Sequence, residues 1–122
     1  MYVKTLLEGD HVLWEDNDVY EPVRADMTYG LLLQYLEVKH PCPLHSHPEI
    51  EQIYYIRSGR GIMTVDGVEK EVGQDTVIYV PPGAQHRLIP AEGEENLTYL
   101  SICHYHEVSS ADRPGVAADS QR

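Results

Sequence analysis

Short apolar segments separated by turn residues constrain the fold of this chain more than any other feature of its sequence. Asp66-Gly67 separates segments 61–65 and 68–72, and this dipeptide is typical of a two-residue β-hairpin. Pro81-Pro82-Gly83 ends another apolar segment, because a proline cannot donate a hydrogen bond to a β-ladder. Between residues 29 and 106 the sequence has no long stretch of helical periodicity. We therefore predict an all-β fold.

The spacing of the turn signals predicts about seven or eight strands, a number typical of a β-sandwich or a small barrel. In segment 31–39, Gln34 shares one face with apolar side chains, whereas Glu37 and Lys39 lie on the other face. In the last predicted strand the pattern does not decide whether Ile102 or Cys103 faces the interior. The clearest predicted strands cover residues 31–39, 52–57, 61–65, 68–72, 76–80 and 97–106.

The chain has 122 residues, which is enough for one domain with one hydrophobic core. We expect residues 29–108 to form the barrel and residues 109–122, which are small and polar, to form a flexible C-terminal tail. Residues 1–28 are expected to form an N-terminal arm that packs on the barrel or on a partner subunit. The nine tyrosines suit strand faces at subunit interfaces, so we also expect a homodimer.

The charge of the chain excludes some classes of partner. Nine Lys and Arg residues against twenty Asp and Glu give a net charge of −11, which argues against binding to nucleic acid or to an anionic membrane. Lys4, Glu8 and Asp10 interrupt the N-terminal segment where a signal peptide needs an apolar run. Cys42 and Cys103 lie far apart and suggest no disulfide framework. We expect a cytoplasmic protein that acts on a small molecule.

Three histidines carry the chemical information in the sequence. His45 and His47 are one residue apart, and on a strand both side chains would point to the same face. His86 follows the rigid Pro81-Pro82-Gly83 turn and can supply a third imidazole from a neighbouring strand. Three imidazoles favour a transition metal such as Zn, Fe, Ni, Cu or Mn over the hard cations.

These two segments, together with Gly59, resemble the paired motifs of the cupins, over about residues 31–106. The resemblance implies a double-stranded β-helix, or jelly-roll barrel, with one divalent transition metal per chain in its lumen (Zn, Ni, Fe or Mn). It also implies that His45, His47 and His86 are three of the metal ligands. Lys39 and Pro90 stand where the family motifs have a glycine and an asparagine. These differences weaken an assignment of the family's substrates to this chain more than they weaken the assignment of the fold.

The fourth ligand implied by the resemblance is usually a glutamate, and two residues compete for its place. The register counted back from Gly59 selects Gln52, whereas the shorter spacing counted forward from His47 selects Glu51. We favour Gln52, because strand alternation then also turns Tyr54 inward. Glu51 remains the alternative.

A glutamine ligand would leave the full formal charge on a divalent ion, which makes it a stronger Lewis acid than a glutamate would. Some cupins that resemble this chain in having three histidines and a glutamine carry out non-redox reactions. We therefore expect an isomerase, cyclase or lyase that polarises a carbonyl of a small oxygenated substrate. Tyr54, as the catalytic residue, or a metal-bound water would move the proton, and Gln34 would contact the substrate. The alternatives are an Fe, Ni or Cu dioxygenase and a barrel that only binds a small molecule.

The remaining histidines have a simpler interpretation. His40, His104 and His106 lie near predicted strand ends, where histidines are usually solvated, and His11 lies outside the motifs. We expect these four side chains to lie on the surface.

Overall fold

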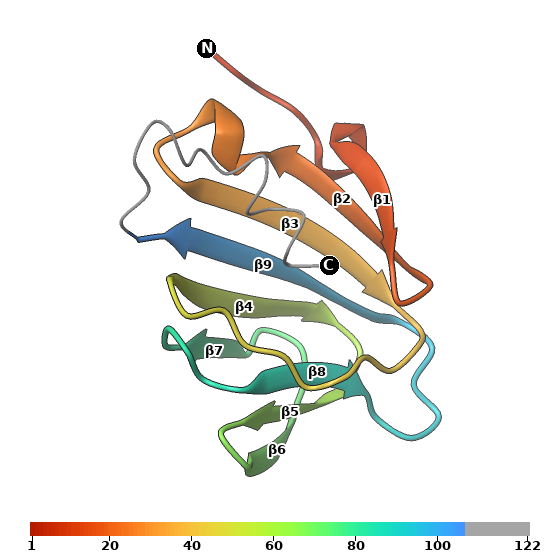
Figure 1. Ribbon diagram of the computed structural model, residues 1–122. Helices are drawn as coiled ribbons and strands as arrows, with labels where there is room; N and C mark the ends of the chain where they lie inside the picture. The colour runs from red at the N-terminus through yellow and green to blue at the C-terminus, as the bar shows by residue number, and fades with distance from the viewer. Residues whose placement is uncertain (107–122) are drawn as a thin grey trace.

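A computed structural model describes residues 1–106 and consists almost entirely of antiparallel strands (Figure 1). Two short 3-10 helices in this part of the chain are η1 (Leu6–Glu8) and η2 (Ala25–Met27). Within the described residues no helix is long and apolar enough to cross a bilayer. The expected tail, residues 109–122, lies outside the described residues. The described strands are β1 (Asp10–Trp14), β2 (Asn17–Val23), β3 (Leu31–Val38), β4 (Ile50–Ser58), β5 (Gly61–Val65), β6 (Val68–Val72), β7 (Val77–Val80), β8 (His86–Pro90) and β9 (Leu97–Tyr105).

The described strands form two sheets. The larger sheet has the order β1-β2-β3-β9-β4-β7, and the smaller sheet has the order β6-β5-β8. The smaller sheet lies against the half of the larger sheet that contains β4 and β7 (Figure 1). Strand β9 lies between β3 and β4 and pairs with both in antiparallel register. The arrangement confirms the predicted all-β jelly-roll barrel.

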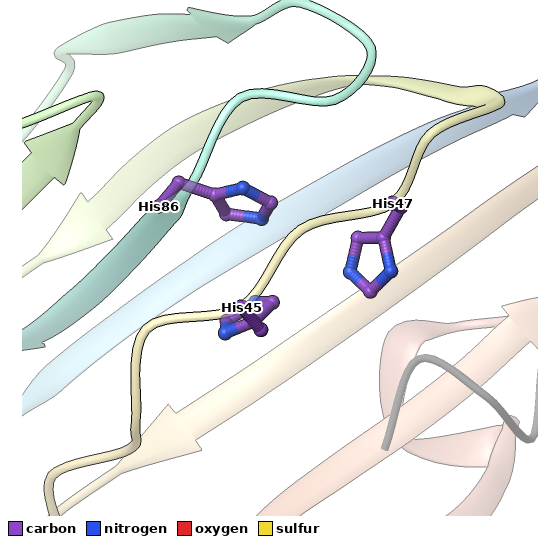
Figure 2. Close-up of side chains that lie close together, drawn as sticks. All are labelled: His45, His47 and His86. Carbon is purple, nitrogen blue, oxygen red and sulfur yellow. The ribbon is translucent and has the colours of Figure 1, made fainter.

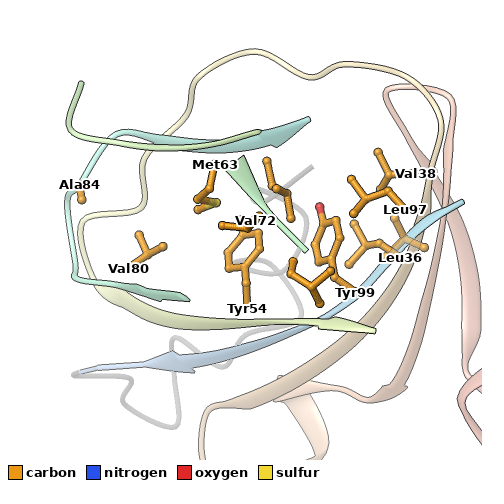
Figure 3. Close-up of a cluster of buried hydrophobic side chains, with 12 residues drawn as sticks. Leu36, Val38, Tyr54, Met63, Val72, Val80, Ala84, Leu97 and Tyr99 are labelled. Carbon is orange, nitrogen blue, oxygen red and sulfur yellow. The ribbon is translucent and has the colours of Figure 1, made fainter. Parts of the chain in front are cut away.

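The hydrophobic core lies between the two sheets (Figure 3). Tyr54 and Ile56 of β4 project toward Met63 of β5 and Leu88 of β8. Ile56 and Leu88 are almost entirely buried, at 0% and 1% exposure. Burial of a side chain of this size contributes about 1.5–3 kcal/mol to folding. This cluster therefore joins the sheet that carries Gln52 to the sheet that carries His86.

Strand alternation on β3 agrees with the sequence pattern, in which Gln34 shares a face with apolar side chains. On β3, Leu32, Gln34 and Leu36 are buried, as predicted for this face. On β9 the structure decides what the pattern left open, because Cys103 is fully buried and Ile102 is 38% exposed.

The N-terminal region contributes two strands that the sequence analysis did not delimit. Strands β1 and β2 form a hairpin, and β2 pairs with β3 of the barrel. The turn residues Glu15 and Asp16 have φ values of 49° and 62°, as both central residues of a type I′ turn require. A Glu-Asp pair is not a typical sequence for such a turn, so this hairpin gave no turn signal. The described residues consequently form nine strands rather than seven or eight.

The segment that contains His45 and His47 is not the regular strand that the sequence analysis assumed. Within it only His45 forms a β-bridge, and its partner is His86. Pro41, Pro43 and Pro48 lie in this segment, and a proline has no N–H to donate to a ladder. The segment is therefore a loop, and strand alternation does not orient its histidines.

A test of the core is replacement of Ile56 by alanine. We expect Ile56→Ala to lower the free energy of unfolding by about 2–5 kcal/mol, because it leaves a cavity between the two sheets. Chemical denaturation measures the change. Val68→Thr, at an exposed position of β6, keeps a β-branched side chain and should change stability by less than about 0.5 kcal/mol. Equal effects of the two substitutions would contradict the position of the core.

Candidate metal centre

Backbone hydrogen bonds hold the histidine loop against β8. The His45 N–H donates to the His86 carbonyl at 3.1 Å, and the His86 N–H donates to the His45 carbonyl at 2.8 Å. This reciprocal pair places the two imidazoles side by side, with ring centroids 4.4 Å apart. The Gly83 N–H donates to the His47 carbonyl at 3.0 Å. The Pro81-Pro82-Gly83 turn therefore positions His47 as well as His86.

The three imidazoles converge on one region of the barrel interior (Figure 2). The ring centroid of His47 lies 5.3 Å from that of His45 and 5.5 Å from that of His86. One nitrogen from each ring lies within 4.8 Å of the other two. Nitrogen ligands of a single ion lie about 2.0–2.1 Å from it, so small side-chain movements would bring all three to a metal.

A buried asparagine that the sequence analysis did not identify holds the start of the loop. Asn17, at the start of β2, accepts hydrogen bonds at Oδ1 from the backbone N–H groups of Lys39 and His40, at 2.8 and 2.9 Å. Its Nδ2 donates to the His40 carbonyl at 3.0 Å. The β1–β2 hairpin thus contributes to the position of the site. The sequence contains no signal for this role, because Asn17 is distant from both motifs.

Hydrogen bonds to backbone carbonyls determine the tautomer of two histidines. His45 Nδ1 lies 2.9 Å from the Pro43 carbonyl oxygen, and His86 Nδ1 lies 2.9 Å from that of Ala84. A carbonyl oxygen only accepts, so each Nδ1 must carry the proton. The Nε2 atom of both rings therefore has a free lone pair, and such a carbonyl partner is typical behind a metal-bound histidine.

Two buried polar atoms at this site have no hydrogen-bond partner within the described residues: His86 Nε2 and Gln52 Oε1. Gln52 Nε2 donates to Ser101 Oγ at 2.7 Å, which turns the amide oxygen away from β9. An unpaired buried acceptor costs about 1–3 kcal/mol, so such atoms indicate a missing partner. A cation would satisfy both acceptors. The residues present therefore fit a metal ion.

Burial keeps the imidazoles neutral. Desolvation, followed by the neighbouring His45 and His86, lowers the pKa of His47 to about 4. Desolvation also lowers the pKa of His45 and of His86, against the opposing effect of their carbonyl partners. A neutral imidazole is the form that binds a metal.

The structure separates the two candidates for the fourth ligand. Gln52 is 4% exposed and faces the barrel interior with the histidines, whereas Glu51 faces outward from β4. Consecutive residues of a strand point to opposite faces, so only one of them can reach the lumen. Gln52 is the residue that the fold brings to the histidines.

A small cavity adjoins the histidines. Its volume is about 20 Å³, which is room for about one water molecule. Tyr54, Gln34 and Gln52 line it, as predicted, but the Gln34 amide already donates to the buried Glu21 carboxylate at 2.7 Å. The lining also includes residues that the sequence analysis did not place there: Trp14, Val19, Leu36, Tyr99 and Ser101.

Tyr54 is buried beside the site. Its ring centroid lies 6.1 Å from that of His86 and 5.2 Å from that of Tyr99, on which it stacks. Burial, followed by the neighbouring Tyr99, raises the pKa of Tyr54 well above its ordinary value, and the nearby Gln52 side chain opposes this rise. Tyr54 is therefore protonated at neutral pH and can act as a hydrogen-bond donor.

Sequence comparison relates the chain to a known domain family. The profile of the Cupin domain matches residues 32–103. An uncharacterized protein of Methanocaldococcus jannaschii is 47% identical over 45 residues, which cover 37% of this chain and 36% of that protein. The chain thus matches about a third of the length of this curated relative.

Solved structures share the fold. A predicted oxalate decarboxylase from Thermotoga maritima superposes with a TM-score of 0.71 at 16% identity, over 84% of this chain and 98% of that chain. A Cupin 2 conserved barrel domain protein from Salinispora arenicola superposes with a TM-score of 0.69 at 16% identity, over 98% of both chains. At this identity the likeness supports the fold and not the reaction.

The ligand set is tested by His86→Ala. We expect this substitution to reduce the metal bound per chain by one equivalent, because it removes one of three converging imidazoles. Titration of untagged, metal-stripped protein with Zn²⁺ against a chelating dye measures the stoichiometry. His11→Ala, at an exposed position of β1, should leave it unchanged. Unchanged binding by a folded His86→Ala protein would exclude His86 as a ligand.

Proposed function

The chain belongs to the cupin family, and we propose that it is a metal-dependent enzyme. It would catalyse the isomerisation or cyclisation of a small oxygenated substrate, or an elimination from it. The observation that carries the proposal is the composition of the site: three neutral imidazoles and the neutral amide oxygen of Gln52. His45, His47, His86 and Gln52 would hold the ion. A divalent ion bound by neutral ligands supplies Lewis acidity, which polarises a carbonyl group.

The chain's own residues would orient the reacting group. The cavity admits a group about the size of a water molecule, so a single carbonyl or hydroxyl enters it while the rest of the substrate stays outside. Tyr54 lines the cavity and carries its proton, so its phenol would donate a hydrogen bond to the oxygen on which negative charge develops. Ser101 and Pro43 would support Gln52 and His45 in their ligating orientations.

Gln34 forms part of one wall of this site, and Glu21 holds its side chain. Their hydrogen bond of 2.7 Å is buried, and Gln34 is part of the cavity lining. With Nε2 of Gln34 bound to the carboxylate, its amide oxygen is the atom that would accept a hydrogen bond from a substrate hydroxyl. Such a contact would favour the binding of a hydroxylated substrate over that of a ketone without a hydroxyl group.

The proposed chemistry predicts exchange of acidic C–H protons with solvent. In D₂O, metal-loaded protein should accelerate deuterium incorporation into dihydroxyacetone or pyruvate beyond the rate with metal-stripped protein, as measured by ¹H NMR. Gln52→Glu should retain the metal but slow this exchange by about tenfold or more, because it cancels one positive charge, and tenfold corresponds to ~1.4 kcal/mol. If the protein does not accelerate deuterium exchange but consumes oxygen with a catechol probe, the proposed activity is wrong and a dioxygenase takes its place.

The role of Tyr54 is tested by removal of its hydroxyl. Tyr54→Phe should leave the bound metal unchanged and lower kcat for exchange by about a hundredfold, as expected when a positioned proton or hydrogen-bond donor is lost. Tyr55→Phe is the matched control, because Tyr55 is the next residue of β4 and bonds outward to Asp75. Equal rates for the two variants would exclude Tyr54 from catalysis.

A further inference from the structure

A second group of metal-ligating side chains lies on the outer face of the larger sheet, away from the lumen. It consists of Glu51 of β4, His104 of β9 and His106, and one ligand atom of each lies within 4.8 Å of the other two. Glu51 Oε1 lies 3.1 Å from His106 Nε2 and 3.9 Å from His104 Nδ1. Ligand atoms around one tetrahedral zinc ion lie about 3.4 Å apart, given bond lengths of about 2.1 Å. The group is therefore close to the spacing of a metal site before any ion is bound.

The strand register creates this group. Glu51 and His104 are direct partners across the β4–β9 ladder, so their side chains leave the sheet side by side. His106 is two residues after His104 and projects to the same face. The His106 N–H donates to the Glu49 carbonyl at 2.8 Å, which holds His106 beside β4 after the end of β9. The two imidazole rings have centroids 4.6 Å apart.

A neighbouring strand orients the carboxylate. The Tyr79 hydroxyl, on β7, donates to Glu51 Oε2 at 2.7 Å, and this bond leaves Oε1 turned toward the histidines. The Tyr79 and His106 hydrogen bonds lower the pKa of Glu51, so the carboxylate is ionised at neutral pH. An oriented, charged carboxylate with two imidazoles is a ligand set found for zinc and similar divalent ions.

The position of the group allows an ion to reach it. The side chains of Glu51, His104 and His106 are 36%, 42% and 43% exposed, so water can complete the coordination. The net charge of −11 also attracts cations to the surface. From this geometry we propose that Glu51, His104 and His106 form a surface site for a divalent transition metal, with zinc as the ion that fits best. The bound ion would join β4 to the end of β9.

The experiment isolates this site by use of His86→Ala, which removes an imidazole from the lumen. Untagged, metal-stripped His86→Ala protein is titrated with Zn²⁺ against a chelating dye, and its melting temperature is recorded with and without Zn²⁺. We expect one equivalent to bind and the melting temperature to rise. Added to this background, Glu51→Gln with His106→Gln should abolish both effects, and Tyr79→Phe should weaken zinc binding by about 10–100-fold. His11→Ala in the same background is the control and should change neither.

The reciprocal variant separates this proposal from the proposed function. Glu51→Gln with His106→Gln in the otherwise unchanged chain should retain one equivalent at the lumen, and it serves as the test if His86→Ala does not fold. The surface site is refuted if zinc binding to this variant equals that of the unchanged chain. It is also refuted if His86→Ala binds no zinc while the unchanged chain binds one equivalent. If the Glu51→Gln, His106→Gln variant binds no zinc while His86→Ala still binds one equivalent, the lumen does not bind the metal. This result would overturn the proposed function and leave the surface site standing.

Discussion

The insertion of β9 between β3 and β4 is the constraint on which the rest of the structure depends. Its ladder with β3 runs from Leu31 to Val38, and its ladder with β4 runs from Ile50 to Ser58. These contacts join the last described strand to strands formed much earlier in the chain, at the entropic cost of closing long loops. The same strand supports Gln52 through Ser101 on the inner face and pairs His104 with Glu51 on the outer face.

The lumen carries an energetic cost that a pure packing core would avoid. His86 Nε2 and Gln52 Oε1 are buried without partners in the described residues, and His47 is held neutral by burial. Each such acceptor destabilises the fold by an amount comparable to a hydrogen bond. The apolar cluster around Ile56 and Leu88 offsets this cost and keeps the two sheets together. Stability therefore comes from one part of the interior, and the polar atoms of the other part are available for a ligand.

Both groups of metal-ligating residues contain two histidines separated by one residue, but the backbone around each pair differs. His45 and His47 lie on a proline-containing loop, so backbone hydrogen bonds to His86 and Gly83 orient them. His104 and His106 follow strand alternation at the end of β9. The first pair is mostly buried and neutral, whereas the second is half-exposed and lies beside a carboxylate. The same sequence pattern thus yields two environments because the backbone around it differs.

Much of the fold could be predicted where local chemistry decides the conformation. Asp66-Gly67 predicts its hairpin because both residues tolerate positive φ, and β5 and β6 have the predicted bounds. The apolar face of β3 follows from alternation alone. The β1–β2 hairpin could not be delimited, because Glu15-Asp16 carries no turn signal and its conformation depends on pairing with β3.

For the candidate site, the sequence by itself determined the chemistry: three imidazoles at motif spacing, Gly59 as a reference for register, and an amide beside an acid at positions 51 and 52. Only the tertiary structure decided which of these two faces the histidines and which meets His104 and His106. It also decided that Asn17 holds the loop and that Tyr99 and Trp14 line the cavity. The physical reason is that residue type and spacing are local properties. Convergence of side chains depends on ladders between strands that are distant in sequence, and the register of these ladders is fixed by the faces that the assembled sheets bury.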